Sequence, residues 1–120
     1  MQHSETATRD NVAQIAAALL DRLRARSPRV HCITNAVAQS FTANMLLAAG
    51  AVPSMTLSPE EIGPFVASAD ALLVNLGTLD RERREATAMA VEAAMRGNVP
   101  WVLDPVFFDR STPRAACCGR

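Results

Sequence analysis

The chain has 120 residues, of which 49% are hydrophobic, so residues 1–120 are expected to form one folded domain rather than a disordered protein. Twelve basic residues balance twelve acidic ones, and this neutral charge argues against nucleic acid or an anionic membrane as a partner. All twelve basic residues are arginine, which excludes a P-loop because that nucleotide-binding motif needs a lysine.

The chain is predicted to begin with a tail and an amphipathic helix. Residues 1–10 are polar and are expected to be frayed. The helix that follows ends before Pro28, which has no backbone N–H to continue it. Its apolar residues recur at helical spacing: Val12, Ile15, Ala16, Leu19, Leu20 and Leu23.

A strand and a second helix are predicted next. The strand, residues 29–35, is apolar until it ends in Thr34 and Asn35. The helix covers residues 38–49 and ends at Gly50, because glycine favours the position after a helix C-terminus. Three of its apolar side chains are placed on one face: Phe41, Met45 and Leu46.

The middle of the chain is predicted to form a short strand and a third helix. Pro53 interrupts the apolar residues 51–55, so this strand is expected to be brief or at a sheet edge. The helix extends to about Ser68. It starts with Ser58 as N-cap and a proline in the first turn, and Glu61 is expected to close a capping box.

Residues 71–75, an uninterrupted apolar run, and residues 99–103 are predicted to be strands, with a helix between them that begins after Asp80 and ends at Gly97. The buried face of this helix is assigned to Ala88, Val91, Ala94 and Met95. Its water-facing side is assigned to Arg81, Arg83, Arg84 and Glu85.

Strands and helices therefore alternate, which predicts an α/β fold with a parallel sheet. Each strand ends in polar or flexible residues: Thr34 and Asn35, Met55 and Thr56, Asn75 to Gly77, Asp104 and Pro105. The carboxyl ends of parallel strands lie at one edge of the sheet, where ligands bind in open α/β folds. We therefore expect these groups to border one crevice.

The acidic residue at a strand end, Asp104, has two open interpretations. Its carboxylate suits a divalent cation held together with phosphates, but aspartate before proline also commonly caps a turn. Spacing alone does not separate them. Met55 has the composition of an ordinary core methionine.

The histidine and cysteines suggest packing rather than chemistry. His31 lies within a strand and is interpreted as a core histidine. Cys32 has no base but its neighbour His31 or His3 in the tail, so it is interpreted as a small buried hydrophobe. Cys117 and Cys118 have no second ligand pair at zinc spacing. An odd cysteine count, no signal peptide and no apolar run of about 20 residues predict a cytoplasmic protein.

Four motifs along the chain share their order and spacing with a known protein family. They are Val30-His31-Cys32-Ile33-Thr34-Asn35, Phe41-Thr42-Ala43-Asn44 with Leu46-Leu47-Ala48-Ala49-Gly50-Ala51, Leu73-Val74-Asn75-Leu76-Gly77-Thr78-Leu79, and Val102-Leu103-Asp104-Pro105-Val106. Together they resemble the N-terminal portion of hydroxyethylthiazole kinases, which act in thiamine salvage. The resemblance covers about Ser27 to Val106.

The resemblance implies a three-layer ribokinase-like α/β fold. It also implies transfer of the ATP γ-phosphate to the hydroxyl of 4-methyl-5-(2-hydroxyethyl)thiazole, with Mg²⁺ as cofactor and a homotrimer as the assembly. Met55 matches the family's substrate-binding methionine, and Asn35 matches an asparagine near the thiazole. Asp104 matches the aspartate beside metal and phosphates.

The last part of the chain departs from the family. Where the family continues with a glycine-rich segment, this chain has Phe107-Phe108-Asp109-Arg110-Ser111, and residues 107–120 are expected to be a divergent, truncated end. The family's ATP-binding residues and its catalytic residue follow later, so no catalytic residue is assigned here and the fold is expected to be incomplete. Two alternatives stay open: an inactive fragment that retains thiazole binding or subunit association, and another ribokinase-like vitamin or sugar kinase.

Overall fold

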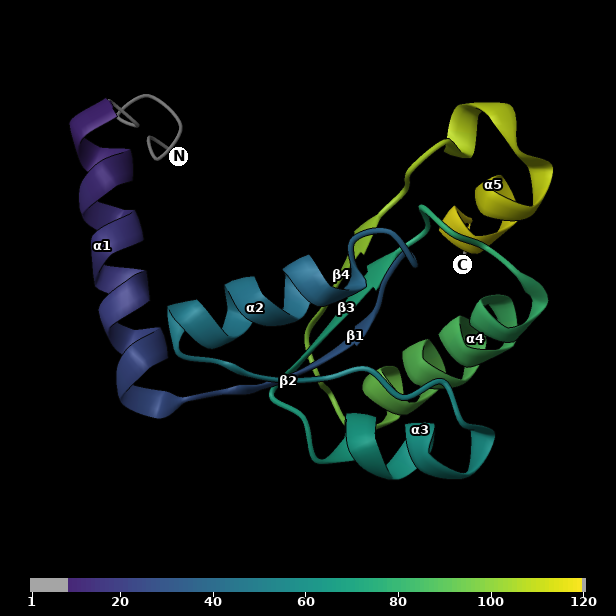
Figure 1. The fold of residues 1–120 in the computed structure, drawn as a ribbon, viewed down its shortest axis with the longest axis horizontal. Helices are drawn as coiled ribbons and strands as arrows, with labels where there is room; N and C mark the ends of the chain where they lie inside the picture. The colour runs from purple at the N-terminus through teal and green to yellow at the C-terminus, as the bar shows by residue number, and fades with distance from the viewer. Residues whose placement is uncertain (1–8, 120) are drawn as a thin grey trace.

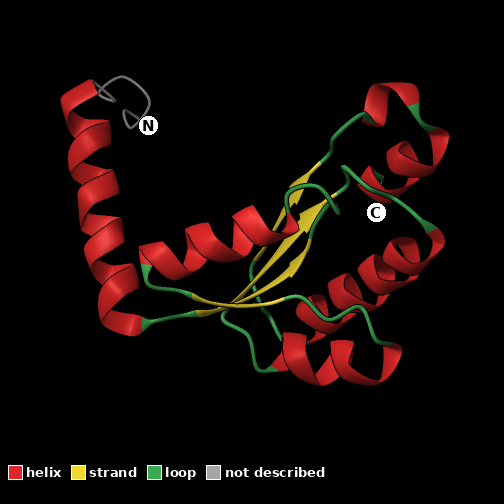
Figure 2. Cartoon of the chain, viewed as in Figure 1, coloured by secondary structure: helices red, strands yellow, loops and turns green. Residues whose placement is uncertain are grey.

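The computed structural model describes residues 9–119 as a parallel four-stranded sheet with helices on both faces (Figures 1 and 2). The strand order is β2-β1-β3-β4, and every adjacent pair is parallel. The strands are β1 (Arg29–Ile33), β2 (Val52–Ser54), β3 (Ala71–Asn75) and β4 (Trp101–Asp104). The predicted α/β class is confirmed, and the strand that contains Pro53 is a short edge strand as expected.

Five α-helices and one 3₁₀ helix are assigned in residues 9–119. They are α1 (Arg9–Arg26), α2 (Gln39–Ala49), α3 (Pro59–Ala67), α4 (Arg81–Arg96), η1 (Phe108–Arg110) and α5 (Thr112–Cys118). In Figure 1, α2 covers one face of the sheet, and α3 and α4 cover the other. The predicted end of α2 is confirmed, because Gly50 has a φ of 104° in the left-handed region that glycine tolerates.

The predicted tail over residues 1–10 lies mostly outside the described residues, and α1 begins at Arg9. In Figure 1, α1 extends away from the sheet and approaches the rest of the chain through its C-terminal end. Its predicted apolar stripe is largely exposed, because Val12, Ile15 and Leu19 each leave more than half of their surface in water. The periodicity therefore identified a helix but not a buried face.

The hydrophobic core lies between the sheet and the α3–α4 layer. Strand β3 contributes Leu72 and Val74, and α3 contributes Ile62 and Val66, all almost fully buried. On the opposite face α2 has no buried residue. Two of the side chains predicted to share a face of α2, Phe41 and Met45, are exposed, while Leu46 is partly buried.

The predicted buried face of α4 was wrong by part of a turn. Of the four residues assigned to it only Ala94 is buried, and Met95 is 65% exposed. The residues that pack against the core are Ala86, Thr87, Ala90 and Ala94. Small side chains on this stripe let α4 approach α3 and β3 closely, and sequence periodicity alone does not reveal that preference.

The predicted capping box of α3 is also absent. Ser58 is the N-cap and Pro59 occupies the first turn as expected, but the Ser58 side chain makes no cap hydrogen bond. Instead the Ser58 hydroxyl donates to Glu60 over 2.6 Å. The Glu61 carboxylate accepts from the Thr56 hydroxyl over 2.9 Å, so Glu61 braces the chain that enters the helix.

Candidate functional site

The carboxyl ends of β1, β3 and β4 bring three polar side chains into one row. Asn75 and Asp104 are register partners on β3 and β4, and Asn35 follows β1 on the other side of β3. The Asn35 Nδ2 donates to Asn75 Oδ1 over 3.2 Å, and the Asn75 Nδ2 donates to Asp104 Oδ2 over 3.3 Å. We call Asn35, Asn75 and Asp104 the polar row. The predicted gathering of strand-end groups at one sheet edge is therefore found for these three.

Asn75 is the central member of the polar row. Its Oδ1 also accepts the Gly77 backbone N–H over 2.8 Å, so the amide oxygen faces two donors while the amide nitrogen faces the Asp104 carboxylate. Gly77 packs directly against Asn35 and Asn75. A Cβ atom at Gly77 would lie 2.9 Å from both the Asn35 Cβ and the Asn75 Oδ1, closer than atoms tolerate. Glycine at this position is required by close approach.

Asn35 is held in place by its own loop as well. Its Oδ1 accepts the Ala38 backbone N–H over 2.8 Å, and the next residue, Ala36, donates its N–H to the Thr78 hydroxyl over 3.1 Å. Both amide atoms of Asn35 thus have partners on fixed elements. The loop between β1 and α2 is consequently tied to the loop between β3 and α4.

Arg83 is a site residue that the sequence did not identify. It was predicted to face water, but only 12% of its side chain is exposed. Its Nε donates to the Thr34 carbonyl over 2.9 Å, and its Nη1 pairs with Asp80 over 2.7 Å. The signal available in the sequence was the Asp80 to Arg83 spacing of an i, i+3 helix pair, which does not point to a contact 49 residues away.

Met55 is not part of the polar row. It directly follows the edge strand β2, which lies on the opposite side of β1 from β3 and β4. It is half-buried and borders a cavity of about 10 Å³ together with Cys32, Thr34, Gln39, Leu57 and Arg83. The strand order therefore places the methionine beside the β1 end and separates it from Asp104 by two strands. Met55 and Asn35 flank the same β1 end, and Asp104 stands at the other side of the row.

The Asp104 carboxylate is not used to cap the turn that follows β4. The Asp104 backbone carbonyl accepts the Val106 N–H over 3.0 Å, so the turn is closed by main chain. The residue is exposed, and its one side-chain hydrogen bond comes from Asn75. Residues 9–119 contain no group of three His, Cys, Asp or Glu side chains arranged for a metal. The exposed Asp104 carboxylate is a hard oxygen donor, which is the ligand type that Mg²⁺ takes together with phosphates and water.

His31 and Cys32 are packing residues, as predicted. The His31 ring is fully buried and contacts the Ser54 hydroxyl over 2.7 Å and the Thr56 carbonyl over 3.1 Å. Burial lowers the pKa of His31 below its usual value, and the hydrogen bond to Thr56 raises it by a smaller amount. Burial also raises the pKa of the Cys32 thiol to about 11, which makes it a poor nucleophile at neutral pH. His3, the alternative base, lies outside the described residues.

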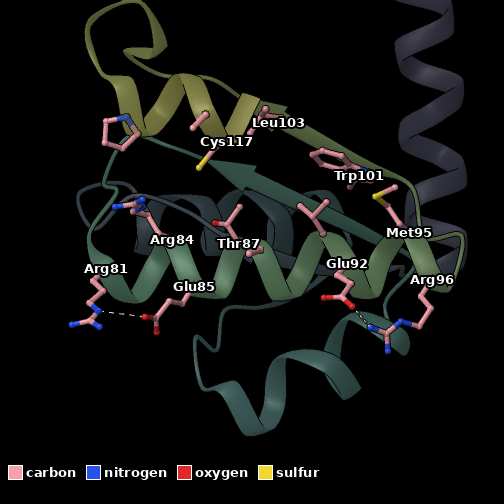
Figure 3. Close-up of a pocket in the computed structure, with 14 residues that line it drawn as sticks. Arg81, Arg84, Glu85, Thr87, Glu92, Met95, Arg96, Trp101, Leu103 and Cys117 are labelled. Carbon is pink, nitrogen blue, oxygen red and sulfur yellow. Dashed lines mark hydrogen bonds and ion pairs between the residues drawn. The ribbon is translucent and has the colours of Figure 1, made fainter. Parts of the chain in front are cut away.

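A much larger groove of about 910 Å³ lies between α4, β4 and α5 (Figure 3). Its apolar surface includes Val91, Trp101 and Leu103. Four of the five charged residues that line it pair along α4 rather than converging: Arg81 with Glu85, and Arg96 with Glu92. No member of the polar row lines it. We therefore place the candidate chemistry at the strand ends, although this groove is the larger hollow.

The C-terminal helix α5 packs beside the strand ends. Arg114 of α5 donates to the Leu76 carbonyl over 2.8 Å and to the Gly77 carbonyl over 3.3 Å. Its guanidinium also lies 5.7 Å from the centre of the Phe107 ring. These contacts tie α5 to the loop after β3.

Among the described residues, no helix has the length and apolar character needed to cross a membrane.

Comparisons with known proteins agree on one family. The sequence model of the hydroxyethylthiazole kinase family matches residues 20–119. A probable hydroxyethylthiazole kinase from Agrobacterium fabrum is 52% identical over 99 residues, which are 82% of this chain and 40% of that protein. The hydroxyethylthiazole kinase of Pectobacterium atrosepticum is 51% identical over 109 residues, which are 91% of this chain and 41% of that protein.

A solved structure supports the same relationship. A hydroxyethylthiazole kinase protein from Pyrococcus horikoshii OT3 aligns with a TM-score of 0.83 and 40% identity, over 88% of this chain and 41% of that chain. The predicted ribokinase-like architecture is thereby confirmed for the matched part. The chain spans about two fifths of the length of these relatives.

Proposed function

Because the chain belongs to the hydroxyethylthiazole kinase family, we propose that it serves the ATP-dependent phosphorylation of 4-methyl-5-(2-hydroxyethyl)thiazole in thiamine biosynthesis or salvage. The phosphoryl group goes from the ATP γ-position to the primary hydroxyl of the thiazole alcohol. Asn35 and Met55 form the substrate side of the site. Asp104 forms the side that faces Mg²⁺ and phosphate.

The observation that supports this assignment is the polar row at the carboxyl ends of the strands. Asn75 bonds to Asn35 on one side and to Asp104 on the other, so one amide connects the two parts of the proposed site. Phosphoryl transfer depends mainly on positioning and on stabilisation of charge, and a rigid hydrogen-bonded row at a sheet edge suits that requirement.

The substrate side suits a small, neutral, largely apolar ring. Met55 offers a flexible thioether, and Asn35 offers an amide beside it on the neighbouring strand end. On the other side, the exposed Asp104 carboxylate would be the ligand that this chain supplies to Mg²⁺. Bound there, the ion would neutralise charge on the phosphates of ATP.

Self-association as a homotrimer in the cytoplasm belongs to the same proposal. Exposed apolar side chains on α1 and α2 support an association surface, since Val12, Ile15, Leu19, Phe41 and Met45 are each more than half exposed. The three cysteines are free, in keeping with a reducing compartment.

Calorimetry with the thiazole alcohol, combined with an ADP-release assay, tests the proposal. We expect saturable heat with the thiazole alone, and release of ADP when ATP and Mg²⁺ are added. If neither the thiazole nor ATP with Mg²⁺ gives heat, the assignment of this site is wrong. A ribose sugar or another vitamin alcohol that binds when the thiazole does not would favour a different ribokinase-like kinase.

A second candidate is binding of the thiazole alcohol without phosphoryl transfer. The observation that favours it is the composition of the polar row, in which two of the three side chains are amides that bind but do not exchange protons at neutral pH. Heat with the thiazole and no ADP release would support this candidate over the first.

A further inference from the structure

The position of Arg83 is unlike that of its neighbours on α4. Arg81, the first residue of α4, leaves 94% of its side chain in water. Arg83 leaves only 12% exposed and extends toward the β1 end. Burial of a guanidinium costs folding free energy unless its N–H groups bond to protein acceptors. The two contacts of Arg83 described below supply these acceptors.

The first contact of Arg83 is a hydrogen bond to the Thr34 carbonyl, which has no partner in the sheet pairing. Strand β1 ends at Ile33, so the carbonyl of Thr34 lies beyond the strand pairing, and Thr34 is only 5% exposed. A buried carbonyl without a partner is destabilising, and Arg83 Nε supplies the partner over 2.9 Å. The Thr34 carbonyl is part of the peptide group that joins Thr34 to Asn35. The hydrogen bond therefore restrains the backbone directly before the Asn35 side chain.

The second contact fixes the orientation of the guanidinium. Asp80 accepts the Arg83 backbone N–H over 2.8 Å at one carboxylate oxygen and Arg83 Nη1 over 2.7 Å at the other. Asp80 thus caps α4 and aims the arginine at the same time. The Arg83 backbone N–H, with smaller help from its side chain, holds the pKa of Asp80 below its usual value.

Arg83 also lies beside the proposed substrate side. Arg83 borders the small cavity, of about 10 Å³, that Met55 and Thr34 also line. Arg83 thereby contacts the backbone before Asn35 and shares the lining of one cavity with Met55.

We propose that Arg83 is a positioning residue for the substrate: held by Asp80, it fixes the Thr34–Asn35 peptide so that Asn35 and Met55 present one preformed wall to the thiazole alcohol. The identity of the ligand in this inference rests on the proposed function. The restraint of the loop by Arg83 is independent of that function.

Arg83→Ala in the full chain tests the proposal, with Arg81→Ala as the matched control on the same helix. We expect Arg83→Ala to weaken binding of 4-methyl-5-(2-hydroxyethyl)thiazole by about tenfold per folded molecule, as loss of one charge-assisted hydrogen bond predicts. Arg81→Ala should stay within about twofold of the original chain, because its ion pair is exposed. Arg83→Lys should recover part of the affinity, since its ammonium can reach one of the two partners.

Amide hydrogen exchange of Ala36 provides a measurement that needs no ligand. We expect Arg83→Ala to speed exchange of the Ala36 N–H by about tenfold relative to the core amide of Val74, because the loop loses a restraint next to it. Unchanged Ala36 exchange in both Arg83 variants overturns the proposal. So does a folded Arg83→Ala chain that binds the thiazole as tightly as the original.

The two hypotheses fail in different ways. If the original chain does not bind the thiazole, the proposed function fails, and Ala36 exchange still decides whether Arg83 restrains the loop. If Arg83→Ala does not fold, Arg83→Lys replaces it in both measurements. Equal loss of affinity in Arg81→Ala and Arg83→Ala would overturn the proposal, because charge alone would then explain the effect.

Discussion

Replacing Gly77 by alanine tests whether the polar row is a close-packed unit. The added methyl group would lie 2.9 Å from the Asn35 Cβ, 2.9 Å from the Asn75 Oδ1 and 3.0 Å from the Asn35 Nδ2. The atoms it meets belong to the two asparagines that bond to each other. Relief of the clash must therefore separate Asn35 from Asn75 or displace the loop that bears Gly77.

The magnitude follows from these contacts. Overpacking by one methyl group costs about 1–3 kcal/mol of folding free energy. Loss of the Asn35 to Asn75 hydrogen bond contributes about 1 kcal/mol, partly counted in the first figure. We expect Gly77→Ala to lower the free energy of unfolding by about 2 kcal/mol and to weaken thiazole binding by about tenfold, since Asn35 moves.

Urea denaturation and calorimetry measure the two effects, and Gly97→Ala is the matched control. A Cβ atom at Gly97 meets nothing closer than 3.5 Å, its φ of −96° suits alanine, and it lies at the opposite end of the sheet. That variant should keep its stability within about 0.5 kcal/mol and its thiazole affinity unchanged. If Gly77→Ala is as stable as Gly97→Ala and binds equally well, the asparagines are not packed as described and the reasoning is refuted.

Three further predictions concern the proposed site and the core. Met55→Asp should weaken thiazole binding by about tenfold or more, because it places a charge at a half-buried apolar position. Calorimetry measures the change in affinity. Asp104→Asn, made at the matching position of a longer relative, should lower turnover more than thiazole affinity in steady-state kinetics, because the metal and phosphate side is altered. The free energy of unfolding should fall as pH drops below about 6.5, by at most about 1.4 kcal/mol per pH unit, because burial lowers the pKa of His31 in the folded chain and the unfolded chain therefore takes up its proton at a higher pH. Urea denaturation between pH 7.5 and 5 measures this slope, and His31→Gln should reduce it.

Each of these predictions has an outcome that contradicts it. Unchanged thiazole affinity in Met55→Asp would remove Met55 from the substrate side. Equal losses of turnover and thiazole affinity in Asp104→Asn would argue against a role confined to metal and phosphate. A slope between pH 6.5 and 5 that is the same with and without His31 would mean that another group titrates there.

Much of the fold was predictable because its signals are local. The uninterrupted apolar run of β3, the proline in the edge strand and the glycine after α2 each act through neighbouring backbone, and all three predictions were confirmed. The polar ends of β1, β3 and β4 were predictable for the same reason. Parallel pairing then places them at one edge by geometry, and the observed register agrees.

The predictions that were wrong depend on distant contacts. Periodicity assigned α4 a buried face through Val91 and Met95, but the close approach of α3 and β3 selects the alanine stripe instead. The capping box at Glu61 was replaced by a bond to Thr56, which lies outside the helix. In each case a local rule was overridden by a neighbour that the rule does not include.

The sequence by itself determined the element order from α1 to β4, the parallel sheet, the family and the identity of Asn35, Met55 and Asp104 as candidate site residues. Only the tertiary structure decided that Asn75 joins the two sides of the polar row, that Gly77 must lack a side chain, and that Arg83 turns inward. The reason is physical. Strand and helix signals act within a few residues, whereas these contacts join side chains and carbonyls 29 to 49 residues apart, and their geometry exists only once the strands are paired.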